Sequence, residues 1–156
     1  MNPDVVHGND WRTLDPGEIG YWEPSQRVTV VVPCYNGQEP LALTFAALAN
    51  QTYPRDLLEV VVADDGSDPP ITVPPGTPFE ARVVAQERAG FGLARARNTG
   101  AASATGSILV FLDCDMVPEP HHVEAHARWH HLDDRILTLG FRHHADLSTR
   151  GGYITA

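Results

Sequence analysis

The segment Ile108–Asp115 constrains the fold of this chain more than any other stretch. It reads Ile-Leu-Val-Phe-Leu-Asp-Cys-Asp, an uninterrupted apolar run that ends in two carboxylates separated by one residue. An apolar run without polar alternation is typical of a strand buried on both faces of a parallel sheet. We therefore expect a strand over residues 107–112. It would carry Asp113 and Asp115 to the carboxyl-terminal edge of the sheet, where ligands bind in open α/β folds.

The acidic pair suggests a metal site. Residues two apart in an extended segment point the same way, so Asp113 and Asp115 can direct oxygens at one point. Mg²⁺ and Mn²⁺ prefer carboxylate oxygens and accept substrate phosphates as their remaining ligands. A solvent-exposed pair of acids at a strand end explains the same pattern, and the motif alone leaves both interpretations open.

Strand-like and helix-like segments alternate along the rest of the chain. Strands are also expected over residues 28–33, 57–63, 81–85 and 136–141, and helices from about Pro40, over about 93–104 and over 119–131. Gly106 is expected to end the 93–104 helix. Strands that alternate with helices form βαβ units, which predicts an α/β fold: a mainly parallel sheet with helices on both faces.

The domain organisation follows from length and composition. The 156 residues and a hydrophobic content of 42% suit one domain with a core. We expect this domain over residues 27–142, between an irregular leader, 1–26, and an irregular tail, 143–156.

Charge and hydropathy exclude several classes of protein. A net charge of −9, from 11 basic and 20 acidic residues, opposes a general nucleic-acid binder. No apolar run approaches the ~20 residues of a membrane helix, and the N-terminus lacks a signal-peptide core. A cytoplasmic location is expected, with peripheral attachment at the inner membrane face as an alternative. Cys34 and Cys114 fit neither a disulfide framework nor a zinc pattern and are expected to be reduced.

Three of the expected strands end in polar clusters, namely Tyr35/Asn36, Asp64/Asp65 and Asp113/Asp115. Because the carboxyl ends of parallel strands share one edge, we expect these side chains to lie close together. Tyr35 suits stacking on a planar base, or it is a partly buried loop tyrosine. Asp64 or Asp65 suits hydrogen bonding to a base or ribose, or the segment only forms a turn.

Two further patterns bear on function. Arg95 and Arg97 flank the start of a helix, where phosphate binds readily, and their spacing predicts that one of them faces the site. His122, His126 and His130 form one helical stripe. Since no acid-rich surroundings are evident, we interpret this stripe as a solvent-exposed face rather than a metal site.

The motifs, taken in order, resemble the nucleotide-binding half of a family-two glycosyltransferase with the GT-A type of Rossmann-like fold. The resemblance covers about residues 28–120, so that fold would be incomplete here. It rests on four stretches, supported by Gln51–Pro54: Val30–Asn36, Val61–Ser67, Ala96–Gly100 and Phe111–Asp115.

The resemblance implies roles for the matching positions. Pro33 and Tyr35 would lie against the nucleotide base, and Asp64 or its neighbour Asp65 would hold the base or ribose. Arg97 and Asn98 would lie near the diphosphate. Asp113 and Asp115 would form the metal motif. Asp115 would be the more direct ligand, and Asp113 would also contact ribose or sugar.

The implied reaction is inverting transfer of a sugar from a UDP-sugar, with Mn²⁺ or Mg²⁺, to the hydroxyl of a saccharide or another acceptor. The catalytic base is expected downstream of this chain, in a missing C-terminal half or on a partner subunit. Activity of residues 1–156 alone is therefore open. Two alternatives remain: a non-catalytic nucleotide-sugar-binding module, and a flavodoxin-like signalling domain in which Asp64 and Asp65 bind Mg²⁺.

Overall fold

A computed structural model describes residues 11–133 and 135–143. In that part of the chain, four strands form one sheet in the order β3-β2-β1-β4, and every pairing is parallel. The strands are β1 (Val28–Cys34), β2 (Leu58–Asp64), β3 (Glu80–Ala85) and β4 (Ile108–Phe111). The helices are α1 (Gln38–Leu48), α2 (Leu93–Ser103) and α3 (His122–His130), with 3-10 turns η1 (Trp11–Thr13) and η2 (Arg55–Leu57).

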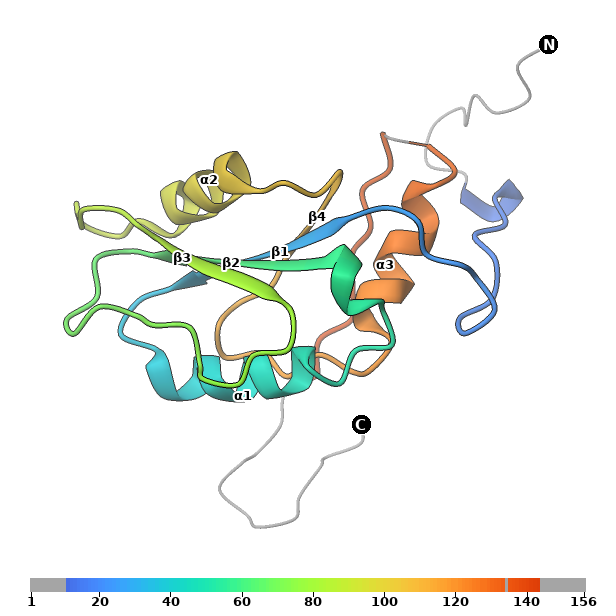
Figure 1. Cartoon of the computed structure of the whole chain (residues 1–156). Coiled ribbons are helices and arrows are strands. Elements are labelled where there is room, and N and C mark those ends of the chain that lie inside the picture. Colours follow the sequence, from blue (N-terminus) through green and yellow to red (C-terminus); the bar gives the residue numbers. More distant parts are fainter. Residues whose placement is uncertain (1–10, 134, 144–156) are drawn as a thin grey trace.

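The helices lie on both faces of the sheet, which confirms the predicted α/β class. Figure 1 shows α2 on one face and α1 on the other, with α3 at the end of the sheet opposite the strands' carboxyl ends. Residues 1–10 of the expected leader and 144–156 of the expected tail lie outside the described residues. Within residues 11–133 and 135–143, no helix combines the length and the apolar character needed to cross a membrane.

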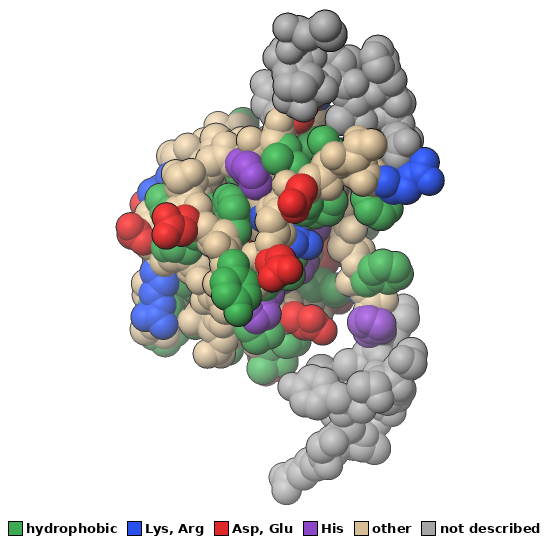
Figure 2. Space-filling model, turned by 90° about the vertical axis from the view of Figure 1, so that its right-hand side faces the viewer, with side chains coloured by type: hydrophobic (Ala, Val, Ile, Leu, Met, Phe, Trp, Pro, Cys, Tyr) green, Lys and Arg blue, Asp and Glu red, His purple; other side chains and the backbone are tan. Residues whose placement is uncertain are grey.

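The expected strand over residues 136–141 is wrong. This segment has no regular secondary structure, and Leu137, Leu139 and Phe141 are 85%, 88% and 98% exposed. It lies near α3, where the Thr138 hydroxyl is 2.6 Å from Nδ1 of His126. Figure 2 shows this end of the molecule, with histidine and acidic side chains among apolar ones. Alternating residues suit a strand, but a strand also needs a neighbouring strand for its hydrogen bonds, and the described residues place none beside it.

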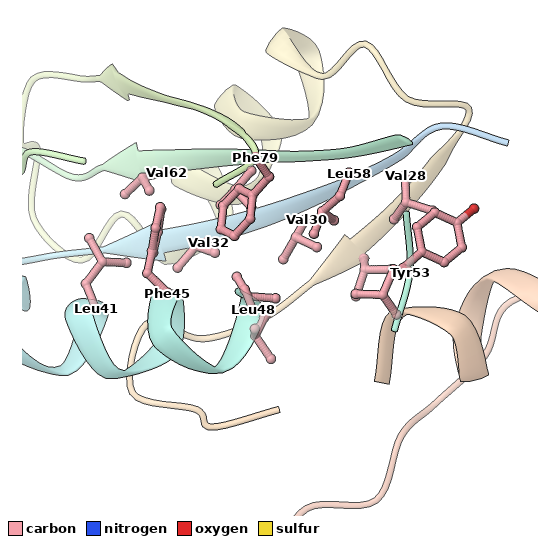
Figure 3. Packing of buried hydrophobic residues seen from close by; sticks show 14 of the residues in the cluster. Val28, Val30, Val32, Leu41, Phe45, Leu48, Tyr53, Leu58, Val62 and Phe79 are labelled. Carbon is pink, nitrogen blue, oxygen red and sulfur yellow. The ribbon is translucent and has the colours of Figure 1, made fainter. Parts of the chain in front are cut away.

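The core lies between the sheet and α1. All seven residues of β1 and of β2 are buried, as expected for central strands of a parallel sheet. The apolar stripe of α1, Leu41, Phe45 and Leu48, packs on this face of the sheet (Figure 3). Each such side chain contributes roughly 1.5–3 kcal/mol when fully buried.

The order in which the strands are connected reverses at one position in the sheet. The chain proceeds outward from β1 to β2 to β3 and then crosses back to place β4 on the other side of β1. The direction of winding therefore reverses between β1 and β4. The carboxyl ends of these two strands, at the left of the sheet in Figure 1, border the crevice where doubly wound folds bind ligands.

Several predicted boundaries shift by a few residues. Leu57 belongs to η2, because its N–H donates to the Pro54 carbonyl at 3.1 Å, and β2 then extends to Asp64. Gly106 does not end α2, which stops at Ser103. Gly106 instead lies against β1, where a Cβ would be 2.7 Å from the Arg27 carbonyl oxygen. A glycine is therefore required for close approach of two backbones.

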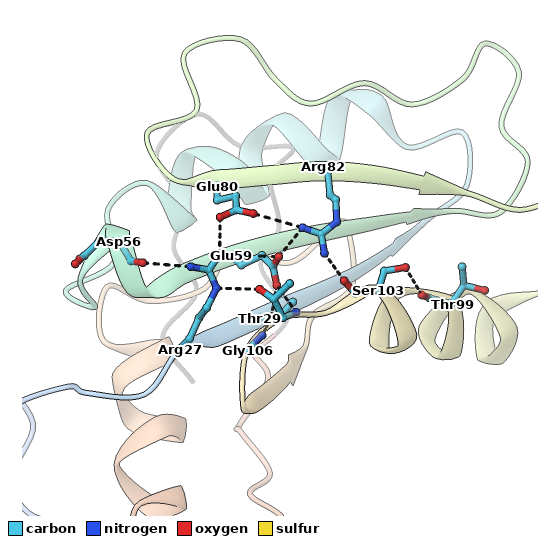
Figure 4. Close-up of polar contacts among 10 residues, drawn as sticks. Arg27, Thr29, Asp56, Glu59, Glu80, Arg82, Thr99, Ser103 and Gly106 are labelled. Atoms are coloured by element: carbon cyan, nitrogen blue, oxygen red, sulfur yellow. Dashed lines mark hydrogen bonds and ion pairs between the residues drawn. The ribbon is translucent and has the colours of Figure 1, made fainter.

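A buried carboxylate that the sequence did not single out joins α2 to the sheet. Glu59 of β2 is 0% exposed and accepts hydrogen bonds from the Thr29 hydroxyl, from the Thr105 N–H at 2.9 Å and from Arg82 at 2.5 Å (Figure 4). Burial alone would raise the pKa of Glu59. The hydrogen bonds outweigh burial and lower that pKa to about 2. This network lies away from the carboxyl ends of the strands, so we assign it to stability.

Candidate functional site

A pocket of about 260 Å³ opens at the carboxyl ends of β1 and β4. Its walls come from five parts of the chain: Pro33–Tyr35 at the end of β1, Asp65 after β2, Arg88 and Phe91 after β3, Leu93 and Ala96 of α2, and Asp113–Asp115 after β4. The three polar clusters predicted at strand ends therefore approach one another. Of the predicted site residues, this pocket brings together Pro33, Tyr35, Asp65, Asp113 and Asp115.

Asp64 does not line the pocket. It is 2% exposed, and its Oδ1 accepts hydrogen bonds from the N–H of Ser67 at 2.9 Å and from the Ser67 hydroxyl at 2.6 Å. Its Oδ2 accepts the Ile71 N–H at 3.2 Å. Both oxygens therefore hold the loop that follows β2, which matches the alternative in which this segment forms a turn.

Asp65 joins the loop after β2 to the start of α2. Its Oδ1 accepts a hydrogen bond from Gln86 at 2.6 Å, and its Oδ2 accepts the N–H of Gly92 at 3.1 Å. A Cβ on Gly92 would lie 2.2 Å from Oδ1 of Asp65, so only glycine fits at this contact. Asp65 is 5% exposed and contributes a carboxylate to the pocket wall.

The ring of Tyr35 stacks on the guanidinium group of Arg88. The guanidinium carbon of Arg88 lies 3.5 Å from the centre of that ring, and its NH1 is 3.6 Å from Oδ2 of Asp65. Sequence reasoning missed Arg88. The signal that could have found it is an arginine in the loop between β3 and α2, at the same edge as the acidic clusters. This cation covers the aromatic face on which a planar ligand would stack.

Arg97 pairs with the acidic motif. Its NH2 donates to Oδ1 of Asp113 at 2.6 Å, and both side chains are partly exposed. Arg95 instead lies 3.8 Å from Asp65, so each arginine pairs with a different carboxylate of the pocket wall. The expectation that one of the two faces the site is not met, because neither lines the pocket. Asn98 is exposed on α2 and, like Arg97, does not line the pocket.

Asp113 and Asp115 place two carboxylates at the pocket, and carboxylates are part of the usual ligand set of Mg²⁺ and Mn²⁺. Asp115 is exposed at the pocket, and Arg97 contacts only Oδ1 of Asp113 in the described contacts. Over the described ranges, no group of three or more His, Cys, Asp or Glu residues could hold a metal ion. Two hard carboxylates at an open pocket suit Mg²⁺ or Mn²⁺ when ligand phosphates supply the other oxygens.

Two cysteines lie at the same strand ends. Cys34 and Cys114 are free thiols that line the pocket; Cys34 is buried and Cys114 is partly exposed. The hydrogen bond with Cys114, together with burial, raises the pKa of Cys34 above its ordinary value.

A second, larger cleft of about 1690 Å³ borders the other side of the acidic motif. It extends from Asp115 along α3 to residues 136–143. The interpretation of the histidine stripe as a solvent-exposed face is wrong, because the 136–141 segment lies against it and His122 and His126 are half-buried, with rings 4.7 Å apart. Burial lowers the pKa of both, that of His126 to about 4.

Comparison with known families gives one match that covers most of the chain. The model described as Glycosyl transferase family 2 matches residues 29–154. A chondroitin synthase of Escherichia coli is 36% identical over 125 residues, which cover 78% of this chain and 18% of that protein. A hyaluronan synthase of Pasteurella multocida is 32% identical over 151 residues, which cover 92% of this chain and 15% of that protein. The chain thus spans less than a fifth of these relatives.

Solved structures share the fold. The mannosyltransferase PcManGT of Pyrobaculum calidifontis, in complex with GDP-Man and Mn²⁺, is 32% identical, with a TM-score of 0.54. The match covers 74% of this chain and 34% of that one. S. aureus TarS 1-349, in complex with UDP-GlcNAc, is 24% identical, with a TM-score of 0.58. That match covers 67% of this chain and 31% of that one.

Proposed function

The chain belongs to glycosyl transferase family 2, and we propose that its α/β domain binds the nucleotide-sugar donor of a glycosyltransferase. One observation carries the proposal: Tyr35, Asp65 and the Asp113/Asp115 pair come from three strand ends and border one pocket at the point where strand order reverses. The family replaces the flavodoxin-like signalling alternative.

The donor we propose is a UDP-sugar. The base would stack on Tyr35 beside Pro33, once the guanidinium of Arg88 has moved from the ring. Of the two candidates for the base or ribose contact we choose Asp65, because Asp64 is buried and both its oxygens already accept hydrogen bonds. A related mannosyltransferase structure contains GDP-Man, so the choice of uracil over guanine is a point for experiment.

We assign the metal to Asp113 and Asp115. Asp115 would be the direct ligand because it is exposed at the pocket, while Arg97 holds Asp113 in place through Oδ1. A bound divalent cation would neutralise charge on the departing diphosphate. The guanidinium of Arg97, next to Asp113, would lie close enough to add positive charge for the same phosphates. Asn98 follows Arg97 on α2 and is exposed, and we assign it to the diphosphate as well.

The acceptor would enter through the larger cleft. Asp115 borders both the 260 Å³ pocket and this cleft, so a hydroxyl in the cleft would face a sugar held in the pocket. An inverting transfer needs a base on the acceptor side to take the hydroxyl proton. We assign that base to a part of the protein beyond this chain, or to a partner subunit.

A donor-binding module that does not transfer sugar by itself is the second candidate. It requires only the donor pocket, whereas transfer also requires a base on the acceptor side. Both candidates require metal-dependent nucleotide binding, and only turnover separates them. We expect residues 1–156 to bind nucleotide and to transfer sugar poorly or not at all.

Calorimetry tests the proposal directly. UDP, GDP and dTDP are titrated with and without Mn²⁺ into the wild-type chain and into Asp115→Ala. The matched control is Asp56→Ala, because Asp56 is an exposed acid in η2, at the opposite end of β2. We expect UDP to bind best and to require Mn²⁺, with binding lost in Asp115→Ala and kept in Asp56→Ala. Equal affinity for all three nucleotides, independent of metal, would contradict the proposal.

A further inference from the structure

We propose that Cys34 and Cys114 are a redox pair that closes reversibly into a disulfide under the control of small-molecule disulfides. The bond would join the carboxyl ends of β1 and β4 at the wall of the pocket. Formation of the bond depends only on the fold. Its effect on ligand binding rests on the proposed function.

The sheet brings the two segments that carry the cysteines side by side. Val28 of β1 pairs with Ile108 of β4, and the register continues to Val31 and Phe111. The N–H of Leu112 donates to the Val31 carbonyl at 3.1 Å, which is the last hydrogen bond between the two segments before they leave the sheet. Cys34 is the last residue of β1, and Cys114 lies in the turn that follows β4, so both cysteines lie at the same edge of the sheet.

The two sulfurs also point to the same place. A Cβ on Gly37 would lie 3.0 Å from Sγ of Cys114 and 3.1 Å from Sγ of Cys34. Both sulfurs therefore border the small space that this glycine leaves open at the start of α1. The last paired residues, Val31 and Phe111, lie on neighbouring strands, which are spaced by about 4.8 Å, and a disulfide needs Cα atoms about 4.4–6.8 Å apart. The pairing therefore brings the two segments close together, and the contact that both sulfurs share at Gly37 directs them at each other.

Burial makes the pair asymmetric. Cys34 is 3% exposed, whereas Cys114 is partly exposed, and both line the open pocket of about 260 Å³. A small disulfide would reach Cys114 through the pocket. The sulfur of Cys34 would then lie next to the modified Cys114, and the burial of Cys34 would keep other thiols from reacting with it. Cys114 is thus the attacking residue and Cys34 the resolving one.

The chemistry balances as two exchanges with a small disulfide, RSSR. The sulfur of Cys114 attacks one sulfur of RSSR, forms Cys114–S–SR and releases one RSH. The sulfur of Cys34 then attacks Sγ of Cys114, forms the Cys34–Cys114 bond and releases a second RSH. The protein loses two hydrogens, and one RSSR is reduced to two RSH.

The bond would affect the proposed donor site because of its neighbours in sequence. Cys34 lies between Pro33 and Tyr35, and Cys114 lies between the two carboxylates of the metal motif. Pulling the two sulfurs into a covalent bond moves the backbone that carries these groups. We expect the oxidised chain to bind UDP and Mn²⁺ more weakly than the reduced chain.

Intact-mass measurement on the full 156-residue chain tests the bond itself. The protein is equilibrated with mixtures of reduced and oxidised glutathione, quenched with acid and digested without reductant. We expect loss of both free thiols, a peptide that joins Cys34 to Cys114, and full reversal by excess reduced glutathione. A stable glutathione adduct on wild-type Cys114, or a disulfide between two chains, would overturn the proposal.

Two matched variants and one solvent control check the assigned order. Cys34→Ser should accumulate a glutathione adduct on Cys114, whereas Cys114→Ser should leave the buried Cys34 unmodified. In urea, the wild-type pair should require a more oxidising mixture, because the fold no longer holds the sulfurs together. An unchanged midpoint in urea would refute a role for the fold.

Calorimetry on the oxidised and reduced forms then tests the consequence for the site. Weaker UDP binding after oxidation supports regulation, and equal affinity refutes it while leaving the bond established. If neither form binds any nucleotide, the proposed function fails, but the mass measurement still decides the disulfide.

Discussion

Replacing Glu59 by Gln tests how much one buried carboxylate contributes to this fold. The side chain is 0% exposed, and its pKa is lowered from an ordinary 4.5 to about 2. This difference corresponds to about 3 kcal/mol of folding free energy at pH 7. In the wild type, one carboxylate oxygen of Glu59 accepts hydrogen bonds from Thr29 and Thr105, and the other accepts one from Arg82. Glutamine has the same volume, but its NH₂ group would replace one of these oxygens and would then face hydrogen-bond donors. We expect Glu59→Gln to lose about 3 kcal/mol at pH 7.

The stability that Glu59 contributes should depend on pH in a definite direction. Because the folded-state pKa is the lower one, the contribution of Glu59 is fully present above the unfolded pKa of 4.5 and is lost as pH falls through about 2. The gap between wild type and Glu59→Gln should therefore shrink by about 2 kcal/mol between pH 7 and pH 3. Urea unfolding followed by circular dichroism measures the free energy of unfolding of both proteins at each pH.

Glu80→Gln is the matched control. Glu80 carries the same group at the exposed end of the same network, 57% exposed and 2.5 Å from Arg27. Its loss should cost no more than about 1 kcal/mol. A Glu59→Gln variant as stable as wild type at pH 7, or a gap that does not change with pH, would refute the reasoning.

Three further changes test packing and the candidate site. Gly100→Ala should lower the free energy of unfolding by about 1–3 kcal/mol, because its Cβ would lie 2.4 Å from Cγ1 of Val31. An unchanged urea midpoint would contradict this. Gly92→Ala should displace Asp65 and weaken UDP binding in calorimetry, and wild-type affinity would count against a role for Asp65. Arg88→Ala should tighten UDP binding about two- to fivefold, since the base no longer displaces a cation worth about 0.5–1 kcal/mol. Weaker binding would show that Arg88 contacts the ligand.

Some site assignments depended on contacts that no pattern contains. Asp64 and Asp65 are adjacent and chemically identical, and the sequence left them as alternatives. The structure separates them, because Asp64 bonds to its own loop through Ser67 and Ile71, whereas Asp65 borders the pocket. The stacking of Arg88 on Tyr35 joins residues 53 positions apart, so no local signal predicts it.

The histidine stripe and the 136–141 segment illustrate the same limit. Helical spacing correctly placed His122 and His126 on one face of α3, but it does not say what covers that face. For residues 136–141 the predicted strand itself is absent, because a strand forms only where another strand offers hydrogen bonds. Both errors arise because the local pattern does not show which distant segment lies beside it.

The amino-acid sequence determined the class of fold and the edge of the sheet at which the polar clusters gather. The apolar runs at residues 28–33 and 57–63 form the central, fully buried strands β1 and β2. The run at residues 108–112, expected to be buried on both faces, instead forms β4 at the edge of the described sheet, where Leu109 and Phe111 are exposed. The polar residues that follow these runs emerge at the carboxyl ends of the strands.

Tertiary structure alone decided which of those polar groups line the pocket and which are bonded to neighbours such as Ser67 and Arg97. It also decided that two cysteines 80 residues apart border the same space beside Gly37. The physical reason is that hydrophobic periodicity is a property of consecutive residues, whereas pairing and burial depend on which distant segments the sheet brings into contact.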